Sequence, residues 1–192
     1  MTRYGKTWGL RGKTPVIKVR TKRGGYNVMS VITTEGEMRY SVKEGSINGD
    51  VFVEFLKHLI QDRDRPLILL VDHATFHYSK VVRDFVHAHR PKLRLFFLPK
   101  RTPEMNPDKQ VWNDIKTNRI GKRPVKDKMD LKRRLYSALG SLRKNTKRIL
   151  SFFRLPDTKY ALQTELCDFY SIPASISFIN QYIILQRKRL KV

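Results

Sequence analysis

The sequence predicts one α/β domain with a mixed sheet, and three observations lead to that fold class. Of the 192 residues, 40% are hydrophobic and 30% charged, so the chain can bury a core. Residues 26–42 alternate between apolar and polar positions around a turn, which indicates an antiparallel hairpin. Two apolar runs, at residues 67–72 and 93–98, are typical of strands buried on both faces. Helical patterns between and after these runs favour parallel strands joined by crossover helices.

The first expected elements are strands. Residues 14–19 are predicted as an edge strand, because proline is tolerated at the start of such a strand. Residues 26–33 and 38–42 are predicted as the two arms of the hairpin, which turns at Glu35 and Gly36.

Three helices are expected to alternate with the apolar strands. The first is capped by Asn48 or Asp50, the second covers residues 79–89, and the third covers residues 108–118. A hairpin that leads into parallel strands with helices between them is the element order of a ribonuclease-H-like fold. The inward faces are expected to carry Phe52, Phe55, Leu56, Leu59 and Ile60 in the first helix, and Val82, Phe85 and Val86 in the second.

The C-terminal third is predicted to be a helical extension followed by a tail. Residues 130–154 combine apolar residues at helical spacing with a basic opposite face, so one long helix is expected there. Residues 162–192 are apolar without a clear face and end in a basic run. We therefore expect one domain over residues 1–161 and a C-terminal tail of unknown role over residues 162–192.

The charge of the chain indicates a polyanionic partner. There are 40 Lys and Arg residues against 17 Asp and Glu residues, a formal net charge of +23. Nucleic acid is the first candidate, because basic side chains that neutralise phosphates release counterions; a merely lysine-rich protein is the alternative. The single Cys167 excludes an intrachain disulfide and a cysteine-based zinc site. No apolar run approaches the roughly 20 residues that span a bilayer, so a cytoplasmic location is expected.

Acidic residues at the ends of the apolar runs suggest a metal-dependent phosphoryl-transfer site. Asp72 ends the first run, and Glu104, Asn106 and Asp108 follow the second. Such chemistry uses two divalent ions that clamp the attacking and leaving oxygens, and Mg²⁺ is held by carboxylate oxygens. On position alone, Asp72 is equally consistent with a loop residue or a helix cap. His77 is expected to orient Asp72 or touch a phosphate, or else to be a hydrogen-bonded residue at a helix start.

Several sequence blocks resemble the bacterial insertion-sequence transposases of the mariner superfamily, which have a DDE endonuclease domain. The block D-H-A-T-F-H-Y-S is similar to the family's D-N-A-x-x-H-x-S pattern, with His73 in place of Asn. Residues 98–116 are similar to L-P-x-Y-S-P-E-L-N-P-x-E-x-x-W-x-x-L-K, and residues 8–15 resemble W-x-x-x-G-x-x-P. The matching positions are Trp8, Gly12, Pro15, Asp72, Ala74, His77, Ser79, Leu98, Pro99, Thr102, Pro103, Glu104, Met105, Asn106, Pro107, Trp112, Ile115 and Lys116.

The resemblance implies three catalytic acids, of which the second stands in its expected place at Asp72. The first lies, in the family, on a central strand before the W-x-x-x-G element, and its loss would leave neighbouring strands unpaired. None of the residues before Trp8 is acidic, so we expect an N-terminally truncated domain. The third position falls on Lys109, whose ammonium group cannot ligate Mg²⁺. Asp108, the neighbouring residue, is the alternative third ligand.

The function implied by the resemblance is the cutting and joining of DNA with Mg²⁺ or Mn²⁺, impaired in this chain. Asp72 and Asp108 are the expected catalytic and metal-binding residues, supported by His77, Asn106 and Glu104. The expected partner is DNA at transposon ends and target sites, in a nucleoid-associated protein. A homodimer is a further expectation, as is a partner product that carries the missing N-terminal part. The residues expected to contact DNA are Lys100, Arg101, Lys116, Arg119, Lys122 and Arg123.

Three alternatives remain open at this point. One is that Met1 is not the true start and that the first acid lies upstream. Another is a non-enzymatic DNA-binding remnant or regulator of an intact transposase, and the third is a ribonuclease-H-type nuclease unrelated to transposition.

Overall fold

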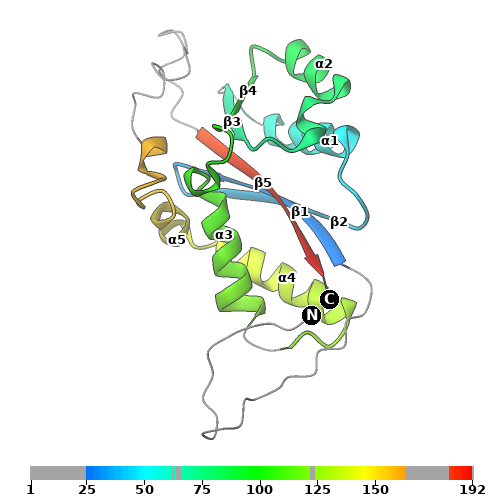
Figure 1. Ribbon diagram of the computed structural model, residues 1–192, viewed down its shortest axis with the longest axis vertical. Coiled ribbons are helices and arrows are strands. Elements are labelled where there is room, and N and C mark those ends of the chain that lie inside the picture. Colours follow the sequence, from blue (N-terminus) through cyan, green and yellow to red (C-terminus); the bar gives the residue numbers. More distant parts are fainter. Residues whose placement is uncertain (1–24, 62, 64–65, 122–123, 163–181, 192) are drawn as a thin grey trace, which may run out of the picture.

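A five-stranded mixed sheet forms the centre of the computed structural model, which describes residues 25–61, 63, 66–121, 124–162 and 182–191 (Figure 1). The strand order across the sheet is β2-β1-β5-β3-β4. The strand expected at residues 14–19 lies outside the described residues, as do Trp8, Gly12 and Pro15. The strands are β1 (Gly25–Thr33), β2 (Met38–Lys43), β3 (Leu67–Val71), β4 (Leu93–Phe97) and β5 (Tyr182–Lys191).

The β1–β2 hairpin forms where the alternating sequence predicts it. The two strands pair antiparallel from Asn27 opposite Lys43 to Ile32 opposite Met38. Gly36 in the turn has a φ of 84°, a left-handed conformation that glycine adopts without a steric penalty. A side chain at this position would also meet Thr146 on a later helix, so the turn fits closely against the helical layer.

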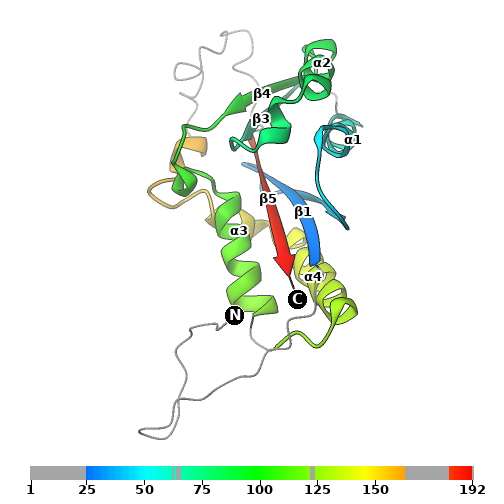
Figure 2. The ribbon, with the colours of Figure 1, turned by 45° about the vertical axis from the view of Figure 1, so that its right-hand side comes forward.

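The C-terminal strand β5 occupies the middle of the sheet, between β1 and β3 (Figure 2). It runs antiparallel to β1, from Gly25 opposite Lys191 to Thr33 opposite Ile183. It also runs parallel to β3, although this pairing covers only the four positions up to Leu185 opposite Val71. The tail for which the sequence predicts no element therefore supplies the strand that connects the hairpin to the β3–β4 pair.

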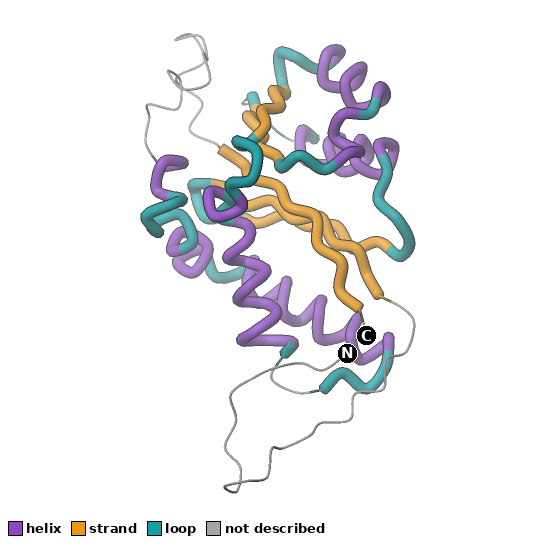
Figure 3. Tube along the Cα trace, viewed as in Figure 1, coloured by secondary structure: helices purple, strands orange, loops and turns teal. Residues whose placement is uncertain are grey.

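Two helical layers cover the two faces of the sheet (Figure 3). One layer contains α1 (Gly49–Ile60) and α2 (Lys80–Ala88), which pack on the side chains of Met29, Val31 and Leu69. The opposite layer packs on Val28, Ile32 and Leu70. It contains α3 (Asp108–Asp114), which continues as a π-helical segment (Ile115–Ile120), and then α4 (Lys128–Arg143) and α5 (Thr146–Ser151). Short 3₁₀ turns cover Thr75–Tyr78, Pro103–Met105 and Lys159–Leu162.

Most predicted boundaries are confirmed, and the mixed α/β class with a ribonuclease-H-like arrangement is observed. Asn48 caps α1, since its side chain accepts a hydrogen bond from the N–H of Val51 at 3.0 Å. In the part of the chain that the structure describes, no helix is long and apolar enough to cross a membrane.

The single helix predicted over residues 130–154 is wrong, because the segment is divided into α4 and α5. The division falls at Lys144 and Asn145, where the Asn145 side chain accepts from the N–H of Arg148 at 2.9 Å. An asparagine that bonds the backbone ahead of it competes with the helical pattern and starts a new helix. The apolar spacing continues across the break, which is why periodicity alone does not reveal it.

Candidate functional site

Asp72 directly follows β3, and its carboxylate remains partly accessible, with 38% of the side chain exposed. One carboxylate oxygen accepts a hydrogen bond from the N–H of Ala74 at 3.1 Å. The Nδ1 of His77 lies 2.8 Å from the Asp72 carbonyl oxygen and 3.5 Å from the same carboxylate oxygen. The position of this carboxylate is therefore fixed by the turn that follows the strand.

His77 is a buried positioning residue in this arrangement. Only 1% of the residue is exposed. Burial lowers the pKa of His77, although its hydrogen bond to Asp72 acts in the opposite direction. Burial thus favours the neutral imidazole. Because its Nδ1 donates to the Asp72 carbonyl oxygen, Nε2 is the acceptor nitrogen of the neutral ring. That Nε2 is buried and has no hydrogen-bond partner.

His73, which replaces the family's asparagine, connects the ends of two strands. Its Nε2 lies 2.6 Å from the carbonyl oxygen of Leu98, just after β4, and its Nδ1 hydrogen-bonds with the hydroxyl of Tyr78. The His73 ring also stacks on Phe97, with the ring centroids 5.5 Å apart. His73 thus holds the turn after β3 against the neighbouring strand end.

Asp108 begins α3 and points into the core rather than to solvent. It is fully buried, and one carboxyl oxygen accepts from the Ser30 hydroxyl at 2.7 Å and from the Trp112 indole N–H at 3.0 Å. The other carboxyl oxygen is buried without a partner. Asn106 fixes the start of the helix, because its side-chain oxygen accepts from the Asp108 N–H at 2.9 Å.

Burial raises the pKa of Asp108 well above its usual range, and the nearby charge of Asp72 raises it further. The hydrogen bonds from Ser30 and Trp112 lower the pKa without offsetting the burial. The two candidate acids therefore lie near enough to repel each other, but their surroundings differ. The Asp72 side chain is partly accessible to solvent, whereas the surroundings of Asp108 favour the neutral acid.

The backbone register places Gln186 of β5 opposite Ser30, next to the end of β3. Gln186 pairs with Ser30 on one side, and the preceding residue, Leu185, pairs with Val71 on the other. Asp72 follows Val71, so Gln186 is the β5 position between Ser30 and Asp72. The ten residues of β5 include no Asp or Glu.

Asp72 and Asp108 differ in what they could offer a divalent metal ion. Within the described ranges, no three His, Cys, Asp or Glu side chains are grouped so that they could hold one. Lys109 is half-buried beside Asp108, and Glu104 is exposed on the Pro103–Met105 turn. The Asp108 carboxyl is enclosed in the core, so of the two candidate acids only Asp72 presents oxygens to solvent.

The predicted DNA-contacting residues have different surroundings. Lys100 and Arg101 are exposed in the loop after β4, whereas Lys116 is half-buried. Lys122 and Arg123 lie outside the described residues. Arg101 has a φ of 61°, an unusual conformation for a residue with a Cβ atom.

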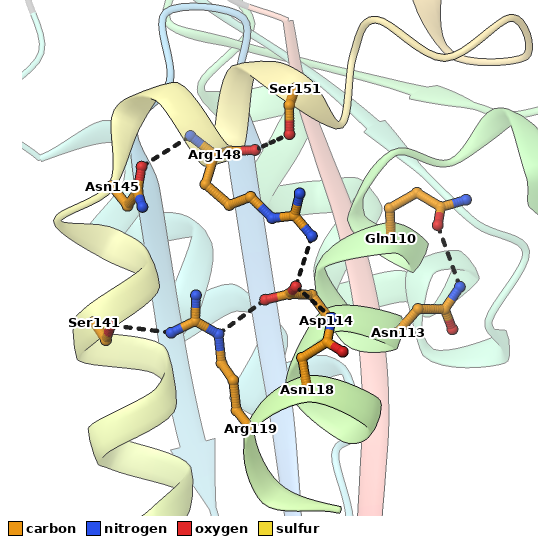
Figure 4. Close-up of polar contacts among 9 residues, drawn as sticks. All are labelled: Gln110, Asn113, Asp114, Asn118, Arg119, Ser141, Asn145, Arg148 and Ser151. Atoms are coloured by element: carbon orange, nitrogen blue, oxygen red, sulfur yellow. Dashed lines mark hydrogen bonds and ion pairs between the residues drawn. The ribbon is translucent and has the colours of Figure 1, made fainter. Parts of the chain in front are cut away.

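Arg119 is held in an intramolecular ion pair (Figure 4). Its Nε donates to Asp114 at 2.8 Å, and its guanidinium also donates to the hydroxyl of Ser141 at 2.9 Å. Arg148 on α5 donates to the other Asp114 oxygen at 2.7 Å, and Asn118 bonds the same oxygen at 2.9 Å. Asp114 therefore connects α3, its π-helical continuation and α5, and Arg119 is committed to this cluster.

Sequence reasoning missed Ser30 and the roles of two nearby side chains. Ser30 is fully buried on a central strand, and a polar residue within the apolar part of β1 is the signal that could have revealed it. Trp112 is buried in the core, and its indole N–H donates to both Ser30 and Asp108. Tyr160 donates to the carbonyl of Met105 at 2.9 Å and so holds the proline-framed turn from the far end of the chain.

Comparison with known protein families matches residues 1–132 to the model described as DDE superfamily endonuclease. That range is more than half of the 192 residues, and it includes Asp72 and Asp108. No curated protein matches the chain.

Proposed function

Because the chain belongs to the DDE superfamily endonuclease family, we propose that it is a transposase catalytic domain that binds DNA but is impaired in cutting it. Members of this family act on DNA and generally use divalent metal ions. The resemblance of the proline-framed block to mariner-superfamily transposases supports an insertion-sequence origin. Under this proposal, Asp72 keeps the place of a metal-binding carboxylate, and His77 and Asn106 support the two acidic positions.

The observation that carries the proposed impairment is the burial of Asp108. A carboxyl group that is fully buried and hydrogen-bonded to Ser30 and Trp112 is poorly placed to offer its oxygens to Mg²⁺. Lys109, the adjacent residue, adds a positive charge that repels the ion. The β5 position opposite Ser30 is Gln186, and the ten residues of β5 include no Asp or Glu.

DNA binding is supported by the charge of the chain. The net charge of +23 is far larger than a fold requires, and Lys100 and Arg101 are exposed on the loop that follows β4. This loop begins beside His73, so phosphate contacts there would bring a DNA backbone close to Asp72. Glu104 on the same loop is proposed as a surface residue and not as a metal ligand. A homodimer, or a partner product that supplies further acids, remains part of the proposal.

A plasmid-nicking assay tests the proposed impairment. We expect the purified chain, with Mg²⁺ or Mn²⁺, to convert no more supercoiled plasmid to nicked circles than the Asp72→Ala variant does. Asp84→Ala is the matched control, because Asp84 is an exposed aspartate on α2 away from the site. Strong metal-dependent nicking that disappears in Asp72→Ala and persists in Asp84→Ala would refute the proposed impairment.

DNA binding is tested separately by fluorescence anisotropy with a labelled duplex. We expect log Kd to rise linearly with log salt concentration, because binding releases counterions. Lys100→Ala and Arg101→Ala should weaken binding, whereas Lys57→Ala on α1 serves as the charge-matched control. If the duplex does not bind at low salt, the proposal as a whole fails.

A second candidate function is a non-enzymatic regulator of an intact transposase, and the pairing of β5 favours it. Among the residues that the structure describes, the centre of the sheet is filled by β5, which lacks acidic residues, so this sheet can support DNA binding without supplying a catalytic acid from its middle strand. Salt-sensitive DNA binding together with no nicking would support this function. Its further test is whether the chain inhibits an active transposase that uses the same DNA.

A further inference from the structure

A cavity of about 280 Å³ lies between α2 and the edge strand β4, and the DNA-cutting chemistry does not account for it. Its apolar walls include Val86 of α2 and Phe97 of β4, and Tyr78 contributes a further aromatic ring. The Tyr78 and Phe97 rings are nearly parallel, at 3°, with centroids 4.5 Å apart. Tyr78 is 45% exposed, so this aromatic pair presents a flat surface to a ligand.

The other side of the cavity is basic. Arg83 and Arg90, both exposed, line it, and none of its nine lining residues is acidic. An aromatic surface beside two guanidinium groups suits a ligand that combines a flat ring with a negative charge.

His77 connects the cavity to the candidate site. It lines the cavity, and its Nδ1 lies 2.8 Å from the Asp72 carbonyl oxygen. Its Nε2 is buried, so recognition of a ligand falls to the aromatic pair and the two arginines.

We propose that this cavity binds one unpaired nucleotide of a DNA strand, with the base against Tyr78 and Phe97 and the phosphate between Arg83 and Arg90. The inference rests on the proposed DNA binding. The cavity, at about 280 Å³, is slightly smaller than the roughly 300–1,000 Å³ of ligand sites, a size that suits a single nucleotide. A base within a duplex cannot enter, because it is stacked and paired, so the cavity selects single-stranded or extruded nucleotides.

The cavity lies next to the candidate site, so a nucleotide bound in it would lie close to Asp72. His77 contacts both the cavity and Asp72, so a bound nucleotide would lie one side chain away from the Asp72 carboxylate. The strand that carries this nucleotide would therefore be fixed next to the candidate catalytic residue.

The test uses the full chain and single-stranded DNA of about 12 nucleotides, a length that covers one binding site. One internal base is replaced by 2-aminopurine, whose fluorescence falls when it stacks on an aromatic ring. We expect quenching on binding and an affinity for the single strand that drops about tenfold in Tyr78→Ala, as the loss of one stacked base predicts. Val86→Met, which narrows the cavity with an apolar side chain, should also abolish the quenching. The affinity for a duplex of the same length should change by less than twofold in both variants.

Matched controls lie on the same helix. Val81→Met places the same side chain on an exposed position outside the cavity, and Lys80→Ala removes one positive charge as Arg83→Ala does. Arg83→Ala should weaken single-strand binding more than Lys80→Ala. If Tyr78→Ala and Val86→Met leave quenching and affinity unchanged while the chain still binds DNA, the cavity inference is wrong and the proposed DNA binding stands. If the unaltered chain binds neither form of DNA, both are wrong.

Discussion

The carboxyl group of Asp108 is fully buried, and this burial alters its ionisation. Its hydrogen bonds to Ser30 and Trp112 connect β1 with α3, so the group contributes to packing while its second oxygen lacks a partner. The pKa of Asp108 is raised in the folded chain by burial. The folded state therefore keeps a proton that the unfolded chain loses near pH 4, and stability falls as the pH rises above that value.

The pH dependence of stability tests the state of Asp108. Asn has the same shape but no ionisable proton, so Asp108→Asn should make the melting temperature less sensitive to pH between about pH 4 and pH 8. The variant should be more stable than the unaltered chain at the alkaline end, where burying the charge is costly. Asp84→Asn, at an exposed position of α2, should leave the pH profile unchanged. Parallel profiles for Asp108→Asn and the unaltered chain would show that Asp108 is not held as the neutral acid.

The sequence was enough to locate some of the site residues, but it did not reveal the contacts of others. Asp72 follows an unbroken apolar run, and such a run places the next polar residue at a strand end. Asp108 was recognised as a candidate, but its inward direction depends on Ser30, which is 78 residues away in the sequence. A contact between residues so far apart in the sequence depends on how the strands pair, and no short stretch of sequence reveals it. For the same reason, the role of His73 in contacting the Leu98 carbonyl could not be predicted.

At the scale of elements, Asp114 joins helices that the sequence treats separately. Its carboxylate contacts Arg119 at the end of the π-helical segment and Arg148 on α5 (Figure 4). Burial raises the pKa of Asp114, but the bonds from Arg119, Asn118 and Arg148 outweigh it and lower the pKa to about 2. Stability from this group is present above the unfolded pKa near 4 and is lost as the pH falls through about 2.

Loss of the Asp114 charge should loosen the attachment of α5. We expect Asp114→Asn to lower the free energy of unfolding by about 1–2 kcal/mol near neutral pH, the size typical of charge-assisted hydrogen bonds. The difference should shrink as the pH falls from about 4 towards 2, because Asp114 is then protonated in both states. Urea unfolding measures the change, and Asp157→Asn, at an exposed position after α5, is the control. An equal effect of both substitutions would argue against a specific role for Asp114.

At the scale of the whole molecule, the central strand comes from the segment whose role the sequence left open. Residues 182–185 are apolar and pair with β3, and residues 183–185 also pair with β1. Residues 186–191 contain four basic residues and pair with β1 alone. Only four residues therefore have the composition of a central strand, too few to stand out in the sequence. The strands β1–β4 could be predicted because apolar alternation or continuous apolar runs extend over each one.

The position of β5 predicts that the sheet depends on the C-terminal residues. A chain that ends at residue 181 would leave the β1–β2 hairpin and the β3–β4 pair without their shared neighbour, and two-stranded pieces are marginally stable in water. We expect this variant to lose cooperative thermal unfolding and hydrogen-exchange protection in β1 and β3. A chain that ends at Lys191 should behave like the full chain, because it keeps all the β5 pairings. Adding a peptide of residues 182–191 to the shortened chain should restore protection, since the backbone groups of β1 and β3 then regain their partners. An unchanged unfolding transition in the chain that ends at residue 181 would mean that β5 does not stabilise the sheet.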